Sequence, residues 1–140
     1  MQISMREVVE EINLLDDPKG RAQLLPSDAL IDKYENLTGI KFSDDYKFFL
    51  KSVSNAFVGT LSPFTLNEEF REKYGDLLLG LKEGREVGVP HDWLPICEDN
   101  GDYYCLLEDG TVRFWSHDGQ AEEMWPDLAS WAKEVWLDEG

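Results

Sequence analysis

Two histidines and two cysteines are the side chains best suited to metal binding or nucleophilic chemistry. The histidines, His91 and His117, each precede an aspartate, and the cysteines are Cys97 and Cys105. Zinc sites usually contain closely spaced pairs such as C-x-x-C or H-x-x-x-H, and neither spacing occurs here. A three-residue turn between the thiols would place them face to face across a hairpin, yet buried free thiols are the commoner outcome in a reducing compartment. We therefore expect no metal site and no cofactor.

Catalytic patterns are absent from the sequence. Ser116 adjoins His117, but neighbouring strand residues point to opposite faces, so adjacency does not make a nucleophile–base pair. No G-x-S-x-G, P-loop or dinucleotide-binding glycine pattern occurs. Residues 99–102 (DNGD) are rich in oxygen ligands, as calcium loops are, but they lack EF-hand spacing and have the composition of a turn. With 29 acidic residues, chance carboxylate pairs are inevitable, so we expect no enzyme.

The charge balance is strongly acidic. The chain has 140 residues, 13 of them basic and 29 acidic, and a formal net charge of -16. Its hydrophobic content of 42% and aromatic content of 12% are typical of a folded domain rather than an acidic disordered chain. Phosphate binding needs clustered Lys and Arg, which excludes nucleic acid as a main ligand and disfavours anionic membranes. The negative electrostatic field of such a chain attracts basic molecules and therefore favours a basic protein as partner.

The acidic excess is densest near the C-terminus. Residues 98–140 hold 12 acidic and two basic side chains, a net charge of -10, and residues 1–97 hold 17 and 11, a net charge of -6. All five tryptophans lie from Trp93 onward. Aromatic side chains beside concentrated charge are typical of a binding surface, although a single Trp is more often core and a charge run is more often a solvated face. Both interpretations remain open for this region.

Helical spacing of apolar residues predicts three amphipathic helices in the first part of the chain. The first covers residues 5–15, the second begins after Ser27 and ends at Gly39, and the third begins after Ser43. The middle is less regular. Residues 57–66 predict a strand, Asn67 suits the N-cap of a helix reaching Leu81, and residues 82–92 predict a loop.

Period-two alternation then predicts an antiparallel meander with strands at residues 94–98, 102–108, 111–116 and 121–125. The turns are Asn100-Gly101, Asp109-Gly110 and Asp118-Gly119. One face should be wholly apolar and pack on the helices; it carries Cys105, Leu107, Val112 and Phe114. The other should be mixed, as a partly covered or binding face is; it carries Tyr104, Leu106, Arg113 and Trp115.

A closing helix is predicted after the sheet, with Pro126 at its first helical position. Its buried side should carry Leu128, Trp131, Ala132 and Val135. The sequence thus predicts an α+β fold: an antiparallel β-meander packed against N-terminal helices, with a closing C-terminal helix. We expect one domain over residues 1–140, in which residues 1–17 form an extra N-terminal helix and residues 27–136 form the core.

Several segments together resemble the signature of the SUKH superfamily. They are Leu37-Thr38-Gly39-Ile40, residues 42–50 (FSDDYKFFL), Leu94-Pro95-Ile96, residues 101–106 (GDYYCL), residues 110–118 (GTVRFWSHD) and residues 127–131 (DLASW). Two positions depart from the usual pattern. Phe42-Ser43 stands where Leu-Pro is usual, and residues 55–57 (NAF) stand where Asn-Gly-Gly is usual.

This resemblance implies a non-catalytic, protein-binding α+β domain. Most bacterial members act as immunity proteins, which bind and neutralise a toxin used in competition between related cells, often a nuclease. Fungal members act as regulatory or scaffold modules in cell-wall signalling. The resemblance therefore implies an immunity protein, with a regulatory module lacking a toxin partner as the alternative.

The residues expected to contact a basic toxin lie on the turns and the mixed face of the meander. They are Glu98, Asp99, Asp102, Glu108, Asp109 and Asp118 for charge, with Tyr104 and Trp115 as aromatic anchors. Trp115 is equally compatible with a place in the core.

The sequence also carries an expectation about location. No basic segment followed by an apolar one opens the chain, and no apolar stretch approaches the roughly 20 residues that span a bilayer. Two cysteines do not make a disulfide framework. We expect a cytoplasmic protein.

Overall fold

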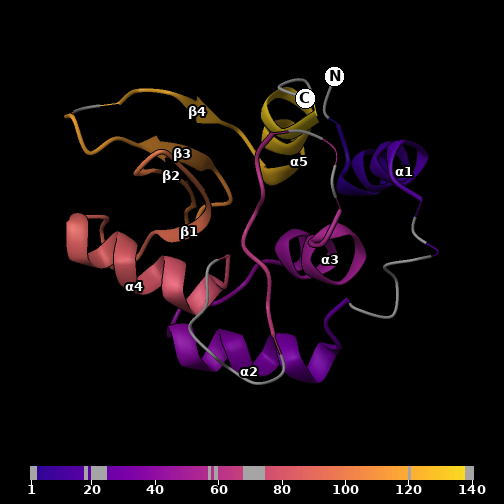
Figure 1. Ribbon diagram of the computed structural model, residues 1–140, viewed down its shortest axis with the longest axis horizontal. Coiled ribbons are helices and arrows are strands. Elements are labelled where there is room, and N and C mark those ends of the chain that lie inside the picture. Colours follow the sequence, from indigo (N-terminus) through magenta and orange to yellow (C-terminus); the bar gives the residue numbers. More distant parts are fainter. Residues whose placement is uncertain are drawn as a thin grey trace.

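Helices form the first part of the chain, an antiparallel sheet follows, and a helical segment closes it (Figure 1). The computed structural model describes residues 3–17, 19, 25–56, 58, 60–67, 75–119 and 121–137. The helices are α1 (Met5–Leu15), α2 (Asp28–Thr38), α3 (Asp44–Val53), α4 (Leu77–Val87) and α5 (Leu128–Trp131), which continues as a π-helical segment (Ala132–Leu137). The strands are β1 (Leu94–Asp99), β2 (Asp102–Leu106), β3 (Val112–Trp115) and β4 (Met124–Trp125). The predicted α+β class is confirmed.

Serine side chains begin the first three helices. Ser4, Ser27 and Ser43 each accept a backbone N–H from the first turn of their helix. Gly39 ends α2 in the left-handed conformation, at φ 73°. Each of the three serine N-caps stabilises its helix by about 1 kcal/mol, because it accepts a backbone N–H that has no partner within the helix. The starts predicted at Ser27 and Ser43 and the end predicted at Gly39 are confirmed.

Helix α4 begins and ends later than predicted. Its N-cap is Asp76, whose carboxylate accepts two N–H groups of the first turn, and not Asn67. The intervening residues 68–74 lie outside the described part of the chain. The helix continues until Gly88 ends it at φ 119°, so the loop prediction is wrong over residues 82–87.

Close packing explains why glycines lie inside α4. A Cβ atom at Gly80 would collide with the ring of Phe64, and one at Gly84 would lie 3.3 Å from Cγ of Pro95. Glycine costs a helix about 1 kcal/mol relative to alanine, and composition alone therefore predicted a loop here. The absence of side chains lets the helix approach its neighbours closely.

The strand predicted over residues 57–66 is wrong for the part that the structure describes, which excludes residues 57 and 59. The segment instead runs irregularly beside the sheet, where the Phe64 N–H donates to the Ile96 carbonyl of β1 at 2.8 Å. Pro63 has no N–H to contribute to a ladder, which disfavours a continuous strand.

The sheet is an antiparallel meander in the order β1-β2-β3-β4, as predicted. Asn100 and Gly101 form a two-residue turn with φ values of 54° and 89°, and the residues that flank them, Asp99 and Asp102, pair with each other. Positive φ at both positions is what a tight type I′ hairpin requires.

The predicted composition of the two sheet faces is wrong. Tyr104 of β2 pairs with Phe114 of β3, and Cys105 pairs with Arg113. Cross-strand partners share a face, so Cys105 lies with Arg113 and not with Phe114. The Leu107 N–H donates to the Thr111 carbonyl at 2.9 Å and closes a loop over residues 108–110, one residue longer than the predicted two-residue turn at 109–110. A shift of one residue in register reverses the face of every side chain.

Helices cover both faces of the sheet. On one face, Gly84 of α4 approaches Pro95, which pairs with Cys105. On the other, the ring centroid of Tyr104 lies 5.5 Å from that of Trp131 in α5. Figure 1 shows the sheet and α4 at one side of the molecule and α1 and α3 at the other, with α5 between them. The core is therefore continuous through α5.

The closing helix supplies the largest buried side chains. Trp131 and Trp136 have no exposed surface, and the ring of Trp136 lies 5.5 Å from that of Phe49 in α3. The predicted buried side is confirmed for Leu128, Trp131, Ala132 and Val135. Its start is corrected by two positions, because Asp127 is the N-cap and the first helical residue is Leu128, not Pro126.

Candidate functional site

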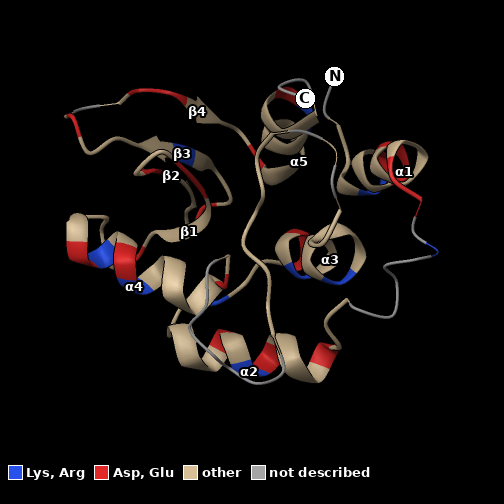
Figure 2. Cartoon of the chain, viewed as in Figure 1, with Lys and Arg blue, Asp and Glu red and all other residues tan. Residues whose placement is uncertain are grey.

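The eight predicted contact residues do not form one site. Glu98, Asp99 and Asp102 lie at the β1–β2 turn, and Asp118 lies in the β3–β4 connection. Both connections are at the same end of the sheet, because β2 begins beside the end of β3. Glu108 and Asp109 lie in the β2–β3 connection, at the opposite end. Figure 2 shows acidic residues at the tip of the β3–β4 connection and along the segment that leads to β4.

A histidine that the sequence prediction set aside joins the two acidic turns. His117 Nδ1 lies 2.6 Å from Asp102 Oδ1, and the His117 N–H donates to the same oxygen at 3.0 Å. On the other side of the ring, Nε2 lies 3.3 Å from Asp118 Oδ1. His117 is separated from Asp102 by 15 positions, so only the strand register could have indicated this contact.

The contact changes the pKa values of both partners. The hydrogen bond to Asp102, followed by the negative charge of Asp118, raises the pKa of His117. Burial alone would raise the pKa of Asp102, but hydrogen bonds and positive charge from His117 outweigh that effect and lower it. The ring therefore favours its protonated form between two carboxylates.

Two of the acidic side chains also accept backbone hydrogen bonds within the turns to which they belong. Glu98 Oε2 accepts the Gly101 N–H at 3.0 Å, and Asp109 Oδ1 accepts the Thr111 N–H at 3.0 Å. The hydrogen bonds from Thr111 lower the pKa of Asp109. Asp118 is largely open to solvent, with 83% of its side chain accessible. Glu98 and Asp109 therefore stabilise their turns, whereas Asp118 projects into solvent.

The two predicted aromatic anchors lie on opposite faces. Tyr104 packs among the rings of Phe114, Trp125 and Trp131, so its ring is part of the core. Trp115 is half-buried on the other face, where its ring centroid lies 6.1 Å from that of Tyr103. Of the two, Trp115 is the one that reaches a surface groove.

That groove has a volume of about 500 Å³ and is lined by β3 and by the segment that leads into β4. The ladder between the two strands joins Val112 to Trp125 and Arg113 to Met124. Beyond it, the Phe114 N–H donates to the Glu123 carbonyl at 3.1 Å, and Ser116 forms an isolated bridge with Gly119. The lining residues of the groove come from both strands and from the loop before β1. They are Trp93, Arg113, Phe114, Trp115, Ser116, Gly119, Ala121, Glu122, Glu123 and Met124.

Sequence reasoning missed the residues of the groove other than Trp115. Glu122, Glu123 and Met124 were assigned to a regular strand over 121–125, whereas β4 contains only residues 124–125. Met124 has 50% of its surface accessible, but this exposure is a property of the folded chain, so no local signal in the sequence could have found the groove.

A second cleft, of about 670 Å³, lies where the α2–α3 connection, α4 and the β2–β3 connection meet. Its polar lining includes Lys41, Arg85 and His91 as well as Glu108. The Arg85 guanidinium donates to the His91 carbonyl at 2.9 Å. The lining also includes Asp92, so its two cations, Lys41 and Arg85, face two carboxylates, and this end of the sheet is mixed in charge.

Comparison with known proteins agrees with this architecture. A family model described as SMI1-KNR4 cell-wall, SUKH_5, matches residues 5–137. The chain belongs to this SUKH family. A crystal structure of a protein from Pseudomonas syringae pv. tomato is similar, with 32% identity, a TM-score of 0.82, and coverage of 95% of this chain and 98% of that one. A search of curated proteins finds no match. Membership of the family supports a protein-interaction domain.

The cysteines of this SUKH domain are free and buried. Cys97 pairs with Tyr104 and Cys105 pairs with Pro95, so the thiols lie on opposite faces of the sheet and do not face each other. Burial, with the nearby charges of Asp99 and Glu98, raises the pKa of Cys97 to about 12, and burial also raises the pKa of Cys105. Neither thiol has the lowered pKa of a nucleophile.

Metal-binding clusters and membrane-spanning helices are both absent from the described residues of the SUKH domain. Within them, no group of three or more His, Cys, Asp or Glu side chains is arranged to hold a metal ion. Within the same residues, no helix is both long enough and apolar enough to cross a membrane.

Proposed function

We propose that this SUKH domain is a non-catalytic immunity protein that binds a basic toxin domain and blocks it in the cytoplasm. The observation that carries the proposal is the gathering of Glu98, Asp99, Asp102 and Asp118 at one end of the sheet, beside the groove at Trp115. The resemblance to immunity proteins and the net charge of -16 support it.

Complementary charge explains how such an inhibitor would work. A nuclease active site is cationic because it binds phosphates, and an acidic surface accelerates association with it and disfavours other partners. The proposed surface needs neither a nucleophile nor a bound metal, because inhibition requires only that the domain occupies the partner's site.

The direct test is co-expression with the product of the adjacent reading frame, followed by affinity purification and size-exclusion chromatography. A stoichiometric complex with a basic toxin domain, and loss of toxicity in cells that carry both, is the expected result. If no basic toxin domain is encoded nearby and none co-purifies, the proposal fails. Weak contacts with several proteins instead would support the regulatory module that the cell-wall description of the family suggests.

A further inference from the structure

We propose that the groove beside β3 binds an arginine side chain of the basic partner, an inference that rests on the proposed function. The aliphatic stem of that arginine would lie over the aromatic floor, and its guanidinium would meet Glu122, which lies two positions before Met124. The groove, rather than the acidic turns alone, would then determine which basic segment the domain accepts.

The floor of the groove is apolar and accessible. Trp93 and Trp115 are half-buried lining residues, and Met124 is 50% exposed beside them. Met124 pairs with Arg113 across β3 and β4, on the sheet face that also carries Trp115. Half-buried indole rings and a methionine offer a surface on which a long aliphatic stem can pack while its charged end stays in water.

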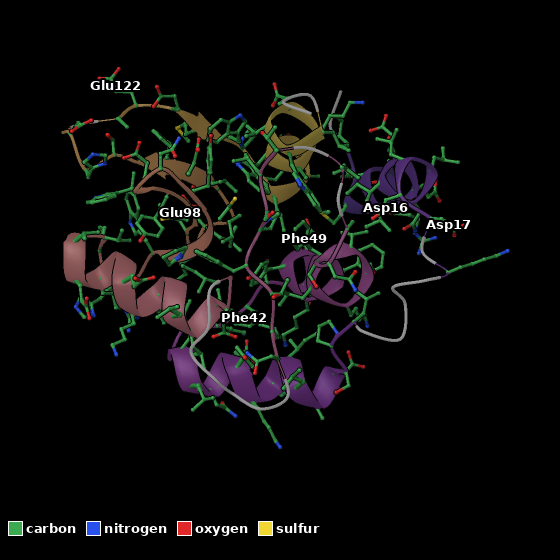
Figure 3. All side chains as sticks on the ribbon, in the orientation of Figure 1. Asp16, Asp17, Phe42, Phe49, Glu98 and Glu122 are labelled. Carbon is green, nitrogen blue, oxygen red and sulfur yellow. The ribbon has the colours of Figure 1, made fainter. Side chains whose placement is uncertain are left out.

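The rim of the groove is acidic. Glu122 and Glu123 are exposed, and among the described residues neither carboxylate has a hydrogen-bond or ion-pair partner. Figure 3 shows Glu122 projecting from the β3–β4 connection, away from the body of the molecule. An exposed carboxylate without a partner among the described residues is well placed to receive a cation from another chain.

The basic residue of the lining does not cancel this charge. Arg113 is near enough to Asp109 to lower the pKa of that carboxyl, after the larger effect of hydrogen bonds from Thr111. The lining holds two carboxylates against one guanidinium, so its net charge stays negative.

Arginine fits this combination better than lysine or an apolar side chain. Its planar guanidinium stacks on indole rings and forms paired hydrogen bonds with carboxylates, whereas lysine presents a compact, strongly hydrated charge. An apolar side chain would fill the floor but would leave Glu122 without a partner.

The test uses the full chain and three blocked peptides, Ac-Gly-Arg-Gly-NH2, its lysine analogue and its citrulline analogue. Each is titrated while the indole resonances of Trp93 and Trp115 are followed by NMR. We expect saturable shifts of both indoles, strongest with arginine, weaker with lysine and least with citrulline, which keeps the shape but loses the charge.

The matched variants are Glu122→Gln with Glu123→Gln, and Glu10→Gln with Asp17→Asn as control. Glu10 and Asp17 are exposed on α1 and just after it, and Figure 3 places Asp17 on the opposite side of the molecule from Glu122. We expect the arginine peptide to bind about fivefold more weakly to the groove variant and unchanged to the control. Equal shifts with arginine and citrulline, or equal weakening in both variants, would overturn the inference.

Failure of this inference is distinguishable from failure of the proposed function. A toxin complex whose affinity is unchanged by Glu122→Gln with Glu123→Gln would remove the groove from the interface and leave the immunity role standing. Arginine-selective binding in the groove without any toxin partner would support the pocket and remove the immunity role.

Discussion

His117 and Asp102 join two turns that lie 15 positions apart in the sequence, through contacts of 2.6 Å from Nδ1 and 3.0 Å from the backbone N–H to one carboxylate oxygen. The β1–β2 hairpin and the β3–β4 connection therefore share a polar junction at the acidic end of the sheet. Because the pKa of His117 is raised and that of Asp102 is lowered, this junction makes the stability of that end dependent on pH.

The first prediction concerns that dependence. The contribution of His117 is fully present below its ordinary pKa of 6.5 and is lost as the pH rises through the raised value. The contribution of Asp102 is present above 3.8 and is lost as the pH falls through its lowered value. NMR titration of His117 should give a lower pKa in Asp102→Asn than in the wild type, with Asp17→Asn as the unchanged control. An identical titration curve in all three proteins would rule out the junction.

The second prediction concerns the glycine inside α4 that meets Phe64. Gly80→Ala should lower the free energy of unfolding by about 1–3 kcal/mol, because the added methyl group would collide with the ring, although alanine is the better helix former. Urea unfolding monitored by circular dichroism measures the change. Phe64→Leu should remove most of the penalty when combined with Gly80→Ala. If Gly80→Ala alone stabilised the protein, helix propensity and not packing would control this position.

Helix ends and helix interiors differ in how far the sequence could predict them. Ser27, Gly39 and Ser43 act within one helical turn, so local patterns were sufficient to place α2 and α3. Gly80 and Gly84 depend on Phe64 and Pro95, which are distant in the sequence, and the rules for local propensity therefore predicted a loop where α4 continues.

The candidate site was predictable only in part for a similar reason. The turn at Asn100-Gly101 has an unambiguous local signature, but the connection at residues 107–111 has no unique length signature, and one residue there decides which side chains share a face. The alternating pattern of residues 121–125 predicts a full strand, whereas β4 holds only Met124 and Trp125, so that pattern could not reveal the groove.

The third prediction concerns a buried carboxylate. Asp76 caps α4, and its Oδ1 also accepts the Tyr34 hydroxyl at 2.7 Å and the Asn67 side-chain amide at 2.7 Å. Asp76→Ala should cost about 3 kcal/mol of unfolding free energy, because it removes the cap and leaves buried donors unsatisfied. The solvent-exposed cap variant Ser43→Ala should cost only about 1 kcal/mol. Chemical denaturation of the two variants, measured side by side, should separate them clearly; equal losses would contradict the assigned network.

The fourth prediction tests which end of the sheet meets the proposed basic partner. Asp99→Lys with Asp118→Lys should slow association about tenfold at low ionic strength, since steering depends on charge at the contact surface. Glu108→Lys with Asp109→Lys makes the same change in net charge at the opposite end and should have a much smaller effect. Stopped-flow measurements over a salt series would compare the two pairs, and the difference should shrink as the Debye length falls towards about 3 Å at 1 M salt. Equal slowing by both pairs would mean that net charge alone steers the partner, and a larger effect at Glu108 and Asp109 would move the interface to that end.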